Sequence, residues 1–156
     1  MAGFYTELAQ HGVQIRTEHQ VYGQFTFDSG YAAARQLLTL RKGAFSAVFC
    51  ANDVMAMAAI QYFTQAGVCV PQDLSVMGYD DAEIATYTTH GLTTVHVPLR
   101  EVATHGCRHL LNLCYGLNLP VQRSFPPHVV WRGSVAPGPA SPLALDCSAV
   151  DLNLPA

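Results

Sequence analysis

The sequence has few charged residues and no long apolar run, and each shortage excludes a class of protein. Charged side chains make up 12% of the 156 residues and the net charge is −3, which gives no electrostatic basis for contact with nucleic acid. No stretch approaches the roughly 20 apolar residues of a membrane span, and the first residues do not read as a signal peptide. We therefore expect a cytoplasmic protein without a membrane segment.

Paired cysteines and catalytic motifs are also missing. The five cysteines form no CxxC pair, and their odd number argues against a secreted disulfide framework. There is no GxSxG elbow and no glycine-rich phosphate loop. His105 and His109 are four residues apart, with Glu101 four residues earlier, but the HExxH pattern and a third ligand are lacking. We therefore expect no enzyme, no metal and no cofactor.

What the chain does contain is a repeated alternation of apolar segments, and the stretch 45–79 organises the rest. An apolar strand (46–50), an apolar helix (54–66) and a second apolar strand (74–77) follow one another. Continuous apolar strands joined by a helix are typical of a βαβ unit in a parallel sheet. With 50% hydrophobic residues, the chain can bury one core. The predicted fold class is α/β with a doubly wound parallel sheet.

The other elements are predicted from periodicity and from turn residues. The chain begins inside a helix, so we expect the first strand of the sheet to be missing. The residues from 136 onward are rich in Pro, Gly and Ser, and we expect a disordered tail over 136–156. The remaining predictions are a helix over 1–10, a strand over 13–21, a helix over 30–40 capped by Asp28 or Ser29, a helical turn or loop over 83–89, a strand over 92–97, a helix over 99–115 and a strand over 129–132.

Polar residues follow both strands of the central unit. Asn52 and Asp53 follow the first, and Asp80 and Asp81 follow the second. Ligands of such sheets bind beyond the carboxyl ends of the strands, so this rim could hold a polar small molecule. Asp53 precedes a helix whose free N–H groups need an acceptor, so helix capping is its predicted role. Asp80 could accept two sugar hydroxyls or a ring N–H, although capping or a surface salt bridge is the alternative, and the role of Asp81 stays open.

These residues together resemble a known family. In order and spacing, they are similar to the effector-binding core of LacI/GalR transcriptional repressors, over roughly residues 1–135. The segments that carry the resemblance are Ala2-Gly3-Phe4, Ser29-Gly30-Tyr31, Phe49-Cys50-Ala51-Asn52-Asp53, Val70-Pro71-Gln72-Asp73-Leu74-Ser75-Val76-Met77-Gly78-Tyr79-Asp80-Asp81 and Leu92-Thr93-Thr94-Val95.

The resemblance implies a periplasmic-binding-protein-like fold and a regulatory role. Residues 1–135 would form a partial effector-binding domain, consisting of the C-terminal lobe plus the returning segment of the other lobe. The first strand and most of the N-terminal lobe would be absent. The expected partners are a small-molecule effector of the sugar or nucleobase class and a second copy of the chain, with DNA contacted only through a helix-turn-helix outside this chain. The alternative function is a periplasmic sugar-binding protein of a transport system, which shares the fold.

The resemblance also implies roles for single residues. Asn52 and Phe25 would contact the effector, the first through its amide and the second by stacking, with a turn amide and a ring folded onto the core as the alternatives. A dimer interface would include Met57 and Phe63 on the helix 54–66, together with Ile84 and Tyr87. Burial of that helix inside the monomer is the alternative.

The helix over 99–115 carries a further expectation. By resemblance it belongs to the lobe whose strands are missing, so its apolar stripe would have no sheet to cover. Each exposed large apolar side chain forfeits about 1.5–3 kcal/mol of burial. We therefore expect this chain to aggregate, oligomerise or fold only in part, and not to bind effector tightly by itself.

Overall fold

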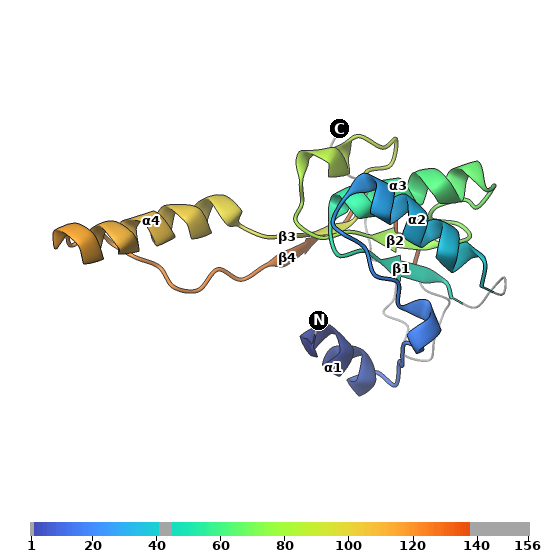
Figure 1. The fold of residues 1–156 in the computed structure, drawn as a ribbon, viewed down its shortest axis with the longest axis horizontal. Helices are drawn as coiled ribbons and strands as arrows, with labels where there is room; N and C mark the ends of the chain where they lie inside the picture. Colours follow the sequence, from blue (N-terminus) through green and yellow to red (C-terminus); the bar gives the residue numbers. More distant parts are fainter. Residues whose placement is uncertain (1, 41–44, 138–156) are drawn as a thin grey trace.

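The computed structural model describes residues 2–40 and 45–137, and its centre is the expected βαβ unit (Figure 1). Strands β1 (Ala47–Phe49) and β2 (Ser75–Met77) pair in parallel, with Val48 opposite Val76. Helix α3 (Asp53–Gln65) connects them and ends before Gly67, whose φ of 77° suits glycine. The prediction of a parallel α/β arrangement is confirmed.

Helix α2 (Phe27–Leu38) lies against α3 (Figure 1). The two helices approach closely at Gly30, where an added Cβ would lie 2.6 Å from the backbone of Met55. The predicted cap of this helix was wrong. Thr26 is the N-cap and forms a capping box with Ser29, because the hydroxyl of Thr26 accepts from the Ser29 N–H at 3.3 Å. Asp28 lies inside the first turn instead.

Strands β3 (Thr94–His96) and β4 (His128–Val130) form an antiparallel ribbon that leaves the sheet beside β2. Isolated parallel bridges join Met77 to Thr93 and Asp80 to His96. The N–H of Gly78 donates to the carbonyl of Thr93 at 2.9 Å. The ribbon is therefore attached to the rim at which the carboxyl end of β2 lies.

Helix α4 (Leu99–Tyr115) projects away from the rest of the molecule (Figure 1), and its bounds match the prediction. It ends at Gly116, whose φ of 64° closes the helix. No residue of α4 is buried. Among the described residues its apolar stripe is uncovered, as expected, with these exposed fractions: Val102 40%, Leu110 59%, Leu111 39% and Leu113 71%.

The segment 13–21 does not form the predicted strand. It contains only the 3₁₀ helix η1 (Thr17–His19), whose His19 N–H bonds to the carbonyl of Arg16. The alternation that suggested a strand has no paired neighbour here, and Val13 is 48% exposed. Helix α1 (Ala2–Gln10) precedes this segment as predicted, and Phe4 stacks on Phe49 of β1 with ring centroids 4.9 Å apart.

The core lies between α3, the strands and η2 (Glu83–Thr86), the helical turn expected at 83–89. Its largest fully buried apolar side chains are Phe63, Leu92 and Val76. Phe63 is 0% exposed, so assigning it to a dimer interface was wrong. The reason is that α3 is apolar on nearly all sides, and the face bearing Phe63 meets the chain's own core.

The predicted tail over 136–156 meets the described residues only at its start. Ala136 donates its N–H to the hydroxyl of Ser75 at 3.0 Å, so the first residue of the predicted tail is bound to β2. The rest of the tail prediction, from 138 onward, lies outside the described residues. Among the described helices, none combines the length and the apolar character needed to cross a membrane.

Candidate effector site

The end of β1 is connected to the loop before α2 through Asn52. The side-chain oxygen of Asn52 accepts from the Met55 N–H at 2.9 Å, so Asn52, not Asp53, caps α3. The prediction of Asp53 as the cap was wrong because Asp53 is already the first residue of the helix. The amide nitrogen of Asn52 donates to the carbonyl of Phe25 at 3.1 Å. One residue thus starts the helix and fixes the neighbouring loop.

Asp53 has a structural role below the rim. It is 1% exposed, and its two oxygens accept from the Ala82 N–H at 2.7 Å and from the hydroxyl of Thr94 at 2.5 Å. Burial raises the pKa of Asp53, while the hydrogen bonds from Thr94 and Ala82 oppose the shift. Gly78 is required beside it, because a Cβ there would collide with the Asp53 carboxylate.

Asp80 is the rim carboxylate without a protein partner. Its backbone N–H donates to the carbonyl of Val95 at 2.9 Å, which holds the main chain of Asp80 against strand β3. Its side chain is half-buried, and no described residue donates a hydrogen bond to its carboxylate. Burial, followed by the negative charge of Asp53, raises the pKa of Asp80. A desolvated, unpartnered acceptor at the end of a strand is suited to a ligand donor.

The neighbouring carboxylate of Asp81 is fully engaged. Arg132 donates to one oxygen at 2.7 Å, and His96 Nδ1 lies 3.0 Å from the other. Burial acts to raise the pKa of Asp81, but the hydrogen bonds and charges of Arg132 and His96 outweigh it, so the pKa is lowered. The carboxylates of the two adjacent aspartates therefore differ in their contacts: that of Asp81 is bonded to Arg132 and His96, and that of Asp80 accepts no hydrogen bond from a described residue.

Phe25 presents an exposed ring at the same rim. Its side chain is 66% exposed, and its carbonyl is held by Asn52. Phe25, Asp80 and Asp81 have φ values of 58°, 108° and 54°, and they are the non-glycine residues with positive φ in the described part of the chain. Such conformations cost about 1–3 kcal/mol each and gather at functional sites.

The charge of the rim also affects a buried thiol. Burial, with Asp53 nearby, raises the pKa of Cys50 to about 12, so its thiol stays protonated at neutral pH. Cys50 is therefore an inert core residue. Among the described residues, no group of three or more His, Cys, Asp or Glu side chains could hold a metal ion.

Sequence reasoning missed His96 and Arg132, which are 15 and 51 residues from Asp81 in the chain. Their convergence depends on how β3 leaves and β4 returns, and no local pattern encodes it. The buried hydroxyl of Thr94, on β3, donates to the carboxylate of Asp53 at the start of α3.

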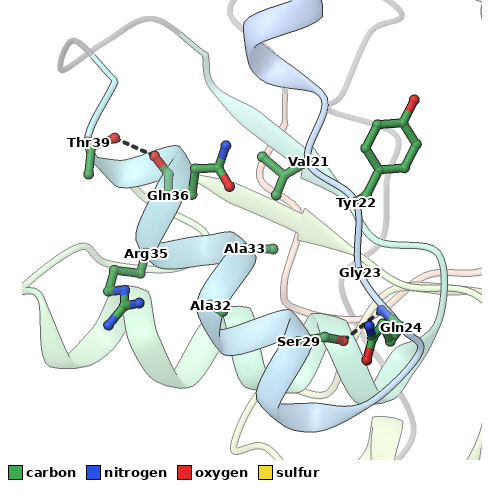
Figure 2. Close-up of a pocket in the computed structure, with 10 residues that line it drawn as sticks. All are labelled: Val21, Tyr22, Gly23, Gln24, Ser29, Ala32, Ala33, Arg35, Gln36 and Thr39. Carbon is green, nitrogen blue, oxygen red and sulfur yellow. Dashed lines mark hydrogen bonds between the residues drawn. The ribbon is translucent and has the colours of Figure 1, made fainter.

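A surface pocket lies elsewhere, between α2 and the segment before it (Figure 2). This open pocket has a volume of about 430 Å³ and contains no rim residue. One of its walls is fixed by the Ser29 hydroxyl, which accepts from the N–H of Gln24 at 3.0 Å. We favour the rim as the ligand site, because polar groups from several segments converge there, whereas one helix and one loop line the pocket. The lining residues are Val21, Tyr22, Gly23, Gln24, Ser29, Ala32, Ala33, Arg35, Gln36 and Thr39.

The residues assigned to a dimer interface differ in exposure. Met57 packs partly against the core and is half-buried, as is Ile84. Tyr87 is 67% exposed. Together with the full burial of Phe63, this leaves Met57, Ile84 and Tyr87 as surface candidates.

A parallel α/β unit whose strand ends carry a polar rim is typical of ligand-binding domains. Residues 1–135 match the model of the family described as periplasmic binding protein-like domain. The HTH-type transcriptional repressor PurR of Erwinia tasmaniensis is 40% identical over 139 residues, covering 88% of this chain and 40% of the repressor. A probable repressor, ExuR of Bacillus subtilis, is 39% identical over 111 residues, 71% of this chain and 33% of its own.

Solved structures give the same result. A LacI-family regulator from Burkholderia phymatum has a TM-score of 0.77 and 44% identity, over 86% of this chain and 48% of that one. A sugar-binding LacI-family regulator from Escherichia coli, solved with phosphate, has a TM-score of 0.77 and 33% identity, over 86% and 48%. The chain belongs to the periplasmic binding protein-like family, and over the matched residues it is similar to the effector-domain portion of LacI-family regulators. It spans about half the length of these structures.

Proposed function

We propose that this chain contributes one wall of an effector site whose ligand is a sugar or a nucleobase. The observation that carries the proposal is the free, half-buried carboxylate of Asp80 beside the engaged carboxylate of Asp81. A carboxylate in this position can accept two hydroxyls of one sugar ring, or one ring N–H of a base. A related LacI-type regulator, CelR, has been solved with cellobiose, which supports the sugar class.

Phe25 and Asn52 complete this wall in the proposal. The exposed ring of Phe25 offers an apolar face for stacking on a sugar or base. Asn52 uses one oxygen lone pair on Met55 and one N–H on Phe25, so its amide retains a further acceptor and a further donor. Asn52 therefore acts twice, by contacting the ligand and by holding the loop that carries Phe25.

The regulatory step follows from a two-lobed architecture. An effector that bridges two lobes favours the arrangement in which both contact it, and that shift changes the affinity of an attached DNA-binding domain. In the proposal, DNA is contacted only through a helix-turn-helix outside this chain. This role is one for a cytoplasmic protein, and the named relatives are transcriptional repressors, which supports it.

A homodimer is the second part of the proposal. Met57, Ile84 and Tyr87 supply apolar surface on and beside α3 that the monomer leaves partly uncovered. Met57→Glu should shift the protein toward monomer, because a charge buried unpaired in an apolar interface is costly. Glu18→Gln, a change on exposed η1, is the control. If sedimentation shows the same oligomer for the unmodified protein, Met57→Glu and Glu18→Gln, Met57 is not part of the interface.

The effector site is tested in a hybrid that supplies a complete domain. Residues 1–135 replace the matching segment of the Burkholderia phymatum regulator, which is 44% identical. Sucrose, cellobiose and hypoxanthine are titrated by calorimetry. For the compound that binds, Asp80→Ala should weaken binding by about 1.5–3 kcal/mol, the usual contribution of a hydrogen bond to a charged group. Glu18→Ala is the control, and equal affinities for both variants would remove Asp80 from the site.

A further inference from the structure

The cluster of Asp81, His96 and Arg132 connects the three segments that meet at the rim. Asp81 follows β2, His96 lies at the end of the outgoing strand β3, and Arg132 follows the returning strand β4. The side chains of Asp81 and Arg132 are 18% and 19% exposed, and that of His96 is 37% exposed. Asp81 and Arg132 thus form a part-buried ion pair, with the His96 ring as a second contact of the carboxylate.

Arg132 also contacts the entrance to β3. Its Nη1 donates to the carbonyl of Leu92 at 2.9 Å, while its Nη2 donates to Asp81. Its backbone N–H donates to the hydroxyl of Thr93 at 2.9 Å, and that hydroxyl donates to the Arg132 carbonyl at 2.8 Å. The guanidinium therefore uses two donors of its rigid fork at once, which a lysine could not reproduce.

The turn that Asp81 terminates carries Asp80. Both residues have positive φ, a conformation that an aspartate keeps only if its surroundings hold it there. The backbone of Asp80 is held by Val95, and the N–H of Asp81 is only loosely held, at 3.4 Å from the hydroxyl of Thr94. The two contacts of the Asp81 carboxylate therefore constrain this end of the turn, together with the bond from the Ala82 N–H to Asp53.

We propose that Asp81 is a positioning residue, which through Arg132 and His96 holds the Asp80 carboxylate free and directed at the ligand. Without Asp81, the unpaired guanidinium of Arg132 has one carboxylate within the same turn to approach, that of Asp80. Asp80 then loses its availability as an acceptor. The effect of Asp81 on ligand binding rests on the proposed function. Its effect on the position of Asp80 can be tested without a ligand.

Titratable groups on two neighbouring elements, α3 and β4, face the cluster of Asp81, His96 and Arg132. Asp53 lies at the start of α3, below the turn, and is held by Thr94 and Ala82. His128 of β4 stacks on His96, with ring centroids 4.9 Å apart. Because these groups remain in every variant below, differences between variants report on the Asp81 contact itself.

The ligand-free test is nuclear magnetic resonance on the 156-residue chain, in which the carboxyl carbon of Asp80 is titrated. Asp81→Asn should lower the pKa of Asp80, because a neighbouring negative charge is lost and the positive charge of Arg132 is no longer paired. Glu83→Gln removes one negative charge from exposed η2 and should leave the Asp80 pKa unchanged. An Asp80 pKa that is the same in both variants overturns the inference.

A second readout separates positioning from simple charge. Arg132→Lys keeps the charge but loses the fork, so the Asp80 N–H should exchange with solvent about 10-fold faster as its turn loosens. The double variant Asp81→Asn/Arg132→Lys should exchange no faster than either single variant, because both break one contact. Additive effects of the two substitutions overturn the proposed coupling.

The binding test uses the hybrid domain, with sucrose as the ligand. Loss of at least 10-fold in affinity for both Asp80→Ala and Asp81→Asn, with the Glu83→Gln affinity unchanged, supports the inference. Loss for Asp80→Ala alone overturns the inference and leaves the proposed function intact. If neither variant changes sucrose affinity, the proposed role of Asp80 for that sugar fails, and the titration and exchange results decide the positioning role on their own.

Discussion

The projecting arm, defined here as α4 with the segment 116–127, differs from the rest of the described molecule, called the body here, in how far its side chains are buried. In the body, α3 buries six residues against the strands and α2. In the arm, α4 has an amphipathic pattern but no buried residue. Both helices form at the residues where their periodicity and terminal signals predict them. The difference shows that local signals set the bounds of a helix, whereas burial depends on a partner surface.

The arm helix is supported by contacts within the arm. The side chain of Asn112 accepts from the Leu119 N–H and donates to the Leu119 carbonyl, both at 2.9 Å. His105 Nδ1 accepts from the Gln122 N–H at 2.8 Å. These bonds fold the segment 116–127 back along α4 but cover little of its apolar stripe. The free energy of unfolding should therefore depend on the body, and the predictions below test that contrast.

The largest contrast is expected between Phe63→Ala in the body and Leu113→Ala in the arm. Phe63 is 0% exposed and Leu113 is 71% exposed. Removing the buried ring should lower the free energy of unfolding by about 3–5 kcal/mol. Removing the exposed leucine should change it by less than about 0.5 kcal/mol. Urea unfolding followed by circular dichroism compares the two, and equal losses would show that the arm is packed in solution.

A smaller effect is expected at the junction of body and arm. Asp81→Asn should lower the free energy of unfolding by about 2 kcal/mol at neutral pH, because Arg132 and His96 lose a charged acceptor. The pKa of Asp81 is lowered in the folded state, so its stabilisation is present above the ordinary aspartate pKa and is lost as the pH falls through the folded value. The difference between variant and parent should therefore shrink as the pH falls from the ordinary aspartate pKa of 3.8 through the lower folded value. A difference that is constant with pH contradicts the ion pair.

The smallest measurable loss in the body is expected at the cap of α3. Asn52→Ala removes the acceptor of the Met55 N–H and should cost about 1 kcal/mol. Asn52→Ser retains a capping oxygen and should recover most of that loss, although its hydroxyl is too short to replace the bond to Phe25. If alanine and serine destabilise equally, the capping role assigned to Asn52 is wrong.

The central unit, the class of the fold and the rim were predictable because they depend on short-range signals. Apolar strands of four or five residues, a helix between them and Gly67 after it identify the βαβ unit, and the strand ends locate Asn52 and Asp80. The cap of α3 was misassigned by one residue, since Asn and Asp are both good caps and adjacent here. The segment 13–21 was misassigned because loose alternation predicts a strand only where a neighbouring strand exists.

The contacts between the rim residues were not predictable from local pattern. Asp53 and Thr94 are 41 residues apart, and Asp81 and Arg132 are 51 residues apart. These pairs form because the β3–β4 ribbon departs from and returns to one end of the sheet. The burial of Phe63 was likewise undetermined, because an all-apolar helix does not show which face meets its own core.

Hydrogen exchange along the chain tests the contrast between body and arm most directly. At low micromolar concentration and neutral pH, the amides of α3 should exchange at rates set by unfolding of the whole body. The amides of α4 should exchange far faster, through local opening of a helix that has no buried face. The account predicts at least a 100-fold difference in exchange rate between the two helices, corresponding to roughly 2.7 kcal/mol. Equal protection of α3 and α4 in a monomeric sample would contradict it.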